Sequence, residues 1–198
     1  MSAHHDEQQE LENAKYLWNN GGKWLVLALV SIALIYWGKG IYRNYQLDKY
    51  AQAAAMATQV KGDVNKLAQL QKDFSGSAAA AQASLETAAL LFEQGKTDQA
   101  IAAYQWVLNN NKTPVFQAVA VQNLANVYLQ QKQYDNALKI LATPIEASFQ
   151  SVMEETKGDV FAAQGKTTEA KQIYQAILDK LPEQSPAREL IQLKISQL

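Results

Sequence analysis

One continuous apolar stretch stands out along an otherwise mixed pattern of hydrophobic and polar positions. Residues 24–38, WLVLALVSIALIYWG, contain no charged residue, and a lysine stands at either side. A helix extended to Tyr42, with both lysines reaching toward the lipid headgroups, supplies the roughly 20 residues that a bilayer span needs. Aromatic rings, which prefer the headgroup layer, lie near both ends. The pattern therefore predicts a transmembrane helix over residues 23–42. Its anchor residues are Lys23, Trp24, Tyr36, Trp37 and Lys39.

A buried helix and a cleaved secretory signal both fit this stretch less well. A buried helix of a soluble protein typically has a shorter apolar run, of about 10 to 14 residues. A secretory signal begins with basic residues and ends at small ones, whereas Glu10 and Glu12 come before the stretch and Ile41 and Arg43 follow it. We therefore expect a permanent anchor, with a short tail at residues 1–22 on one side of the membrane and a large domain on the other.

The residues after the span favour helix throughout. No proline occurs from Tyr42 to Val60, and residues 51–57 are rich in alanine, the strongest helix former. We expect a helical stalk over residues 43–62, which Gly62 and Asp63 end before a second helix. Nothing in the chain alternates with the period of a strand. The predicted fold class is all-α.

From residue 78 onward the sequence repeats itself. Residues 95–108 align without gaps with residues 165–178, and half of the aligned positions are identical. Residues 132–141 follow the same scheme, so that Ala100, Ala137 and Ala170 are 37 and 33 residues apart. Such spacing indicates structural repeats with a period of about 34 residues.

These repeats resemble the tetratricopeptide repeat, a pair of antiparallel helices that pack closely through small residues. Ala88, Ala125 and Gly158 take its first small position, and the three repeated alanines take the second. The resemblance implies three stacked helix pairs in residues 63–198, whose ends need covering helices. Residues 62–74 are one predicted cover, and residues 186–198 are the other, with Leu190, Leu193 and Leu198 on a helical pattern. Pro144 comes early, so the second helix of the middle repeat should be short or bent.

Composition excludes several kinds of chemistry. The formal charge of −1, without a basic stripe, gives no footprint for nucleic acid. The chain has no cysteine, and its two histidines, His4 and His5, lie in the polar tail. Without a glycine-rich phosphate loop or a histidine in the large domain, we expect no catalytic, cofactor or metal site, and no enzyme activity. Carboxylates such as Glu154 are interpreted as solvated surface charge.

A stacked helical repeat instead presents a groove made by the first helix of each pair. In the tetratricopeptide frame the groove carries amide and apolar side chains and has an acidic end. Asn126 has no Lys or Arg beside it in this frame, which argues against a clamp for a terminal carboxylate. Phe92 and Leu129 serve equally well as packing residues. The predicted partner groove consists of Gln82, Leu85, Phe92, Gln122, Asn126, Leu129, Glu155 and Asp159.

The order of these features resembles the YfgM family of bacterial inner-membrane proteins, which are ancillary subunits of the Sec translocon. The matching features are the NGGK segment before the span, the Tyr-Trp pair at its end, the alanine-rich residues 78–91, three degenerate repeats and the closing LKISQL. The resemblance implies a cytoplasmic tail at residues 1–22 and a periplasmic repeat domain. It also implies association with the SecYEG translocon and with a periplasmic chaperone such as a membrane-anchored prolyl isomerase.

The charges around the span argue differently about orientation. Lys15 and Lys23 come before the span, against Lys39, Arg43 and Lys49 after it. Because basic residues favour the cytoplasmic side, this count leans slightly toward a cytoplasmic repeat domain. A cytoplasmic-facing scaffold for another inner-membrane complex is therefore the alternative to the periplasmic adaptor that the resemblance implies.

Overall fold

The computed structural model describes residues 3–198, which form helices and turns with no strand among them. This confirms the predicted all-α class. The chain divides into two compact units, Met1–Ala51 and Gln52–Leu198. The second unit begins inside the segment assigned to a stalk, so the end of that segment belongs to the repeat domain.

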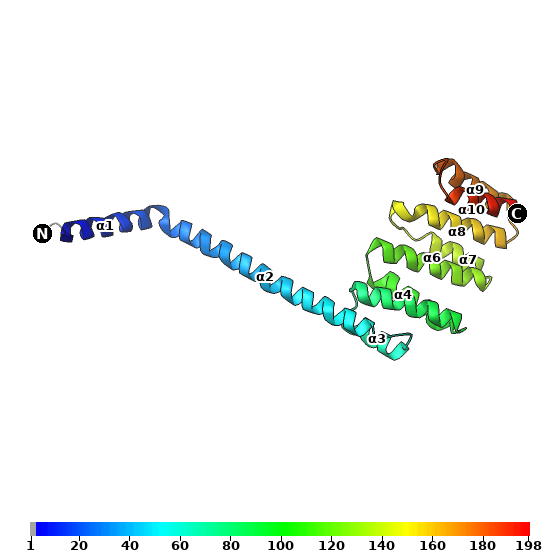
Figure 1. Cartoon of the computed structure of the whole chain (residues 1–198), viewed down its shortest axis with the longest axis horizontal. Helices are drawn as coiled ribbons and strands as arrows, with labels where there is room; N and C mark the ends of the chain where they lie inside the picture. Colours follow the sequence, from blue (N-terminus) through cyan, green and yellow to red (C-terminus); the bar gives the residue numbers. More distant parts are fainter. Residues whose placement is uncertain (1–2) are drawn as a thin grey trace. The chain divides into compact units, whose positions relative to one another are not determined.

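The first unit contains a helix, a break and the start of a long helix (Figure 1). Helix α1 spans Ala3–Leu17, a π-helical turn η1 covers Trp18–Gly22, and α2 spans Lys23–Ala57. Within η1, Asn20 leaves the helical region and Gly21 adopts a φ of 123°, which a residue with a Cβ rarely tolerates. The Asn-Asn-Gly-Gly sequence thus separates α1 from α2.

Helix α2 carries the predicted membrane span. At about 1.5 Å per residue its 35 residues exceed the roughly 30 Å of a bilayer core. Among the described residues, the helical stretch Gln9–Ala57 is the one that length and composition would allow to cross a membrane, and none of its most apolar part is buried in protein. Ser31 Oγ donates to the Leu27 carbonyl at 2.8 Å, so this hydroxyl needs no water. The five anchor side chains, Lys23, Trp24, Tyr36, Trp37 and Lys39, are all exposed.

The second unit begins with the last turns of α2. Ala53 and Val60 are 1% and 2% exposed, and Val60 belongs to the main apolar core. The chain then turns through Lys61 and Gly62, both with positive φ, into α3, Val64–Asp73. Asp63 caps α3, because its Oδ1 accepts from the backbone N–H of Asn65 at 2.9 Å and of Lys66 at 3.2 Å. The predicted start of this covering helix is confirmed.

Three helix pairs follow in sequence order (Figure 1). They are α4 Ala78–Glu93 with α5 Thr97–Asn110, α6 Pro114–Gln130 with α7 Tyr134–Leu141, and α8 Gln150–Ala163 with α9 Thr167–Lys180. The same turn joins each pair, with a positive φ at Gly95, Lys132 or Gly165. The following N–H bonds back to the carbonyl of Leu91, Tyr128 or Phe161 at 2.8 to 2.9 Å. The repeat predicted from the sequence is therefore a repeat in structure.

The small positions lie where helices pack most closely. Ala88, Ala125, Ala100, Ala137 and Ala170 are all 0% exposed. Gly158 is also buried, and a Cβ there would lie 2.9 Å from Tyr174 Cδ1 and closer still to Cε1. The glycine thus leaves room for the aromatic ring of the helix paired with it.

The middle repeat and the C-terminal cover differ from the regular pattern. Helix α7 has 8 residues where α5 and α9 each have 14, which confirms the short second helix expected ahead of Pro144. A 3₁₀ turn, η2 Ala147–Phe149, precedes α8. The C-terminal cover is α10, Ala187–Ser196, which buries Ile191 against α9.

The expected apolar face of the C-terminal cover is wrong. Leu190, Leu193 and Leu198 are 49%, 53% and 36% exposed, whereas Ile191 is 1% exposed and Ile195 packs beside it. Both faces of α10 carry apolar residues at helical spacing. The fit of isoleucine side chains against Tyr174 and Ile177 decides which face turns inward.

Candidate partner-binding groove

The first helices of the three pairs, α4, α6 and α8, follow one another along the repeat domain (Figure 1). They carry all eight residues predicted for the groove. Of these, Gln82 is exposed and the other seven are half-buried. Their surroundings divide them into a central amide pair, a packed first repeat and an acidic third repeat.

Helix α6 supplies the central pair, Gln122 and Asn126. These residues lie one helical turn apart on one face, and neither side chain makes a hydrogen bond to another described residue. Leu129 continues the same helix and is half-buried. Free amide groups can donate to and accept from a peptide backbone.

Helix α4 presents mostly packed side chains. Leu85 and Phe92 lie against the main core, and their contacts are those of packing residues. Gln82 is exposed, and its amide donates to Glu86 Oε1 at 2.9 Å. The first repeat therefore offers one exposed amide beside one carboxylate.

Helix α8 carries an acidic pair that is already engaged within the chain. Lys194 of α10 donates to both carboxylate oxygens of Asp159, at 2.7 and 2.8 Å, and lies 2.8 Å from Glu155 Oε1. Tyr174 Oη of α9 donates to Asp159 Oδ1 at 2.7 Å. Four side chains from three helices thus form one network. Its members are Glu155, Asp159, Tyr174 and Lys194.

Burial and charge shift the pKa of Lys194 in opposite directions and the pKa of Tyr174 in the same direction. Burial alone lowers the pKa of the Lys194 ammonium, but hydrogen bonds to Asp159 and Glu155 outweigh it and leave that pKa raised. Burial, followed by the hydrogen bond to Asp159 and its charge, raises the pKa of the Tyr174 hydroxyl. At neutral pH both groups keep their protons, and both donate to the carboxylates.

Sequence reasoning placed Glu155 and Asp159 in the groove but did not identify Lys194. The lysine follows Asp159 by 35 residues, and no local spacing connects the two. Only the return of α10 onto the third repeat brings them together. Among the described residues, no three His, Asp or Glu side chains are grouped so that they could hold a metal ion.

Comparison with known proteins finds relatives that match the chain over nearly the full length of both. A family model described as a tetratricopeptide repeat-like domain matches residues 15–198. A protein from Neisseria gonorrhoeae named ancillary SecYEG translocon subunit is 43% identical, over 100% of both chains. A protein of that name from Aggregatibacter actinomycetemcomitans is 26% identical over 98% of both chains. One from Escherichia coli is also 26% identical, over 100% of this chain and 99% of the relative. The similarity includes the apolar helix as well as the repeats.

Proposed function

Because this chain belongs to the family of ancillary SecYEG translocon subunits, the YfgM family, we propose that it is a membrane-anchored adaptor of the Sec translocon. The apolar part of α2 spans the bacterial inner membrane. The repeat domain lies in the periplasm and links SecYEG to a periplasmic chaperone, such as a membrane-anchored prolyl isomerase. The observation that carries the proposal is the combination of an exposed apolar helix with a helical repeat domain over the full length of named relatives.

The adaptor binds its partners through the central repeat and catalyses no reaction on them. Gln122 and Asn126 are half-buried and have no partner among the described side chains, so a bound polypeptide can use their hydrogen-bonding capacity. Contacts that dominate binding tend to lie near the middle of an interface, and α6 has a first helix on either side. Residues 1–22 form the cytoplasmic tail, residues 23–42 the span, and residues 43–51 the connection to the domain.

Orientation is the first test, because a cytoplasmic-facing scaffold is the competing function. The three basic residues after the span, against two before it, favour that alternative slightly. Two reporters are fused in turn after Leu198. Alkaline phosphatase is active only in the periplasm. Green fluorescent protein fluoresces in the cytoplasm but not after export through Sec. We expect phosphatase activity and no fluorescence. The opposite result would establish the cytoplasmic scaffold.

The groove is tested by Gln122→Ala combined with Asn126→Ala. Glu155 is left intact, because it holds Lys194 and its loss would disturb α10. Surface changes of this kind alter stability by about 0.5 kcal/mol or less per site. We expect wild-type abundance and reduced co-purification of SecYEG and chaperone subunits, since an unsatisfied interface partner costs about 1 to 3 kcal/mol.

The matched control replaces two exposed amides outside the predicted groove, Gln99 and Gln105 of α5, by alanine. This variant should recover both partners in full. Full recovery with the α6 variant as well would remove these amides from the binding surface.

A further inference from the structure

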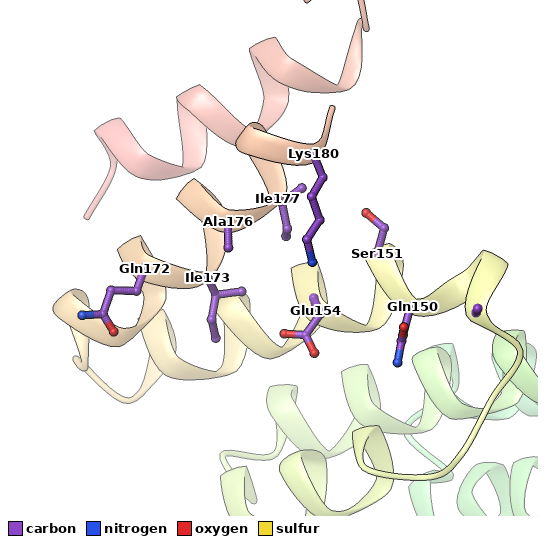
Figure 2. Close-up of a pocket in the computed structure, with 9 residues that line it drawn as sticks. Gln150, Ser151, Glu154, Gln172, Ile173, Ala176, Ile177 and Lys180 are labelled. Carbon is purple, nitrogen blue, oxygen red and sulfur yellow. The ribbon is translucent and has the colours of Figure 1, made fainter. Parts of the chain in front are cut away.

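A hollow of about 550 Å³ lies between α8 and α9. Figure 2 shows Ile173, Ala176 and Ile177 of α9 facing Gln150 and Glu154 of α8 across it. A second hollow of about 380 Å³ shares Gln150 and Glu154 and continues to α7. Neither hollow is lined by any of the eight residues predicted for the groove.

The short α7 explains why this space is open. The second helices α5 and α9 each have 14 residues, but α7 ends at Leu141 after 8. Pro144 prevents α7 from continuing, and Leu141 and Ile145 line the second hollow from that side. Together the two hollows are lined by α7, α8 and α9, and the missing turns of a full-length α7 would begin where the second hollow lies. The fold thus leaves an open place that is lined by apolar side chains of α7 and α9 together with polar ones such as Gln150, Ser151 and Gln172.

Charge restricts what can enter this place. Lys180 extends from α9 toward α8 at the edge of the hollow (Figure 2), and it forms no ion pair with any described residue. Glu154 lies 3.9 Å from Lys157, so its charge is already offset. Counted over the two hollows together, Lys157 and Lys180 against Glu154 give a net charge of +1. An apolar segment that carries a carboxylate complements it, whereas a basic segment does not.

We propose that a short amphipathic helix of a partner protein docks between α7 and α9, where it replaces the missing turns of α7. Its apolar stripe packs on Ile173, Ala176 and Ile177, and an acidic residue at the end of the stripe meets Lys180. This is the helix-in-groove mode of recognition. The interface is separate from the amides of α6, so the two surfaces can hold two partners at once.

The test uses the full chain in lipid nanodiscs and two fluorescein-labelled, stapled helical peptides. Both peptides have leucines at i, i+3, i+4 and i+7, and one ends its stripe with glutamate, the other with lysine. Fluorescence anisotropy is measured against empty nanodiscs. We expect the glutamate peptide to bind more tightly than the lysine peptide. Lys180→Glu should weaken the glutamate peptide by about tenfold or more and reverse the preference.

Two controls locate the binding. Lys171→Glu makes the same charge change at an exposed position of α9 outside the hollow and should leave both affinities within about twofold. Ala176→Arg fills the hollow and should abolish binding, whereas Ala163→Arg, at the exposed end of α8, should not. Circular dichroism confirms that each variant is folded.

Several results would overturn the proposal. They are the absence of binding by either peptide up to millimolar concentration, equal binding of the glutamate peptide to wild type and Lys180→Glu, and binding that survives Ala176→Arg. A dimer that Ala176→Arg dissociates in analytical ultracentrifugation would show that a second copy of the chain covers the hollow instead. None of these results depends on the orientation or on the SecYEG association proposed above.

Discussion

At the scale of single residues, the positions that matter most are the small ones. An alanine or glycine at a helix crossing contributes little buried area itself, but it sets how closely two helices approach. Gly158 is the sharpest case, because the Tyr174 ring occupies the space that a Cβ would need. The ring also places its hydroxyl on Asp159. The absence of a side chain at Gly158 thus lets Tyr174 of α9 join the polar network at Asp159.

We predict that Gly158→Ala destabilises the repeat domain. Alanine is the better helix former by about 1 kcal/mol, but overpacking in a close-packed core costs typically about 1 to 3 kcal/mol. The net effect on the free energy of unfolding should be a loss, measured by urea denaturation. Tyr174→Leu in the same chain should recover part of the loss from the glycine substitution. A gain in stability for Gly158→Ala alone would show that Tyr174 moves freely.

At the scale of elements, α10 is held by polar contacts at both ends as well as by packing, and Arg188 near its start donates to the carbonyls of Leu178 and Leu181 at 2.7 and 2.9 Å. Ile191 and Ile195 pack on α9, and Lys194 joins α10 to the two carboxylates of α8. The side chains of Lys194, Glu155 and Asp159 keep 22%, 29% and 32% of their exposure, so water screens part of their interaction.

Lys194→Met should therefore cost about 1 to 2 kcal/mol, because it leaves the half-buried Glu155 without its partner and Asp159 with Tyr174 Oη alone. The change keeps the length of the apolar stem and removes the charge. Hydrogen exchange should show faster exchange confined to α10 and the end of α9. Lys171→Met, at an exposed site on α9, is the matched control and should leave the exchange unchanged. Equal exchange in the two variants would mean that the Lys194 contacts do not help to hold α10.

The same network predicts a loss of stability in alkali. The folded-state pKa values of Lys194 and Tyr174 lie above the ordinary values of 10.5 and 10.0, so the folded chain holds both protons more tightly than the unfolded chain. Burial and Glu93 shift the pKa of Tyr104 in the same direction. This stabilisation is complete below the unfolded values and is lost as pH rises through the folded values. Denaturant midpoints should stay level up to about pH 9 and fall as the pH rises above about 10, and the fall should be smaller in Lys194→Met/Tyr174→Phe.

At the scale of the whole molecule, the repeat domain and the membrane helix are joined by one continuous α2, yet they are separate compact units. The repeat domain buries Ala53 in the last turns of α2 and Val60 in the turn that follows them. The helix that carries the predicted span therefore also contributes a buried side chain to the repeat domain.

We predict that a fragment of residues 52–198 is soluble and folds without the anchor, since repeat stacking needs no lipid. A fragment of residues 63–198 should also be helical by circular dichroism. It should be less stable by about 1 to 3 kcal/mol, because it lacks the buried Val60 side chain and the turns around it. Equal urea midpoints for the two fragments would show that residues 52–62 only rest on the domain. Aggregation of both would mean that the domain needs its membrane segment.

The sequence by itself determined the features that depend on local pattern. The apolar helix, the Asn-Asn-Gly-Gly break, the Asp63 cap, the period of the repeats and the short α7 all follow from propensity and spacing over a few turns. The positions of the small packing residues could be predicted because an alanine or glycine recurs at the same place in all three repeats. The tertiary structure decided whatever needed two distant segments to meet. Lys194 reaches Asp159 only after α10 folds back, and Ile191 rather than Leu190 turns inward because of the shape it meets on α9. The hollow beside α9 likewise exists because α7 ends early and α9 does not. A difference between two helices of the fold cannot be predicted from either segment taken alone.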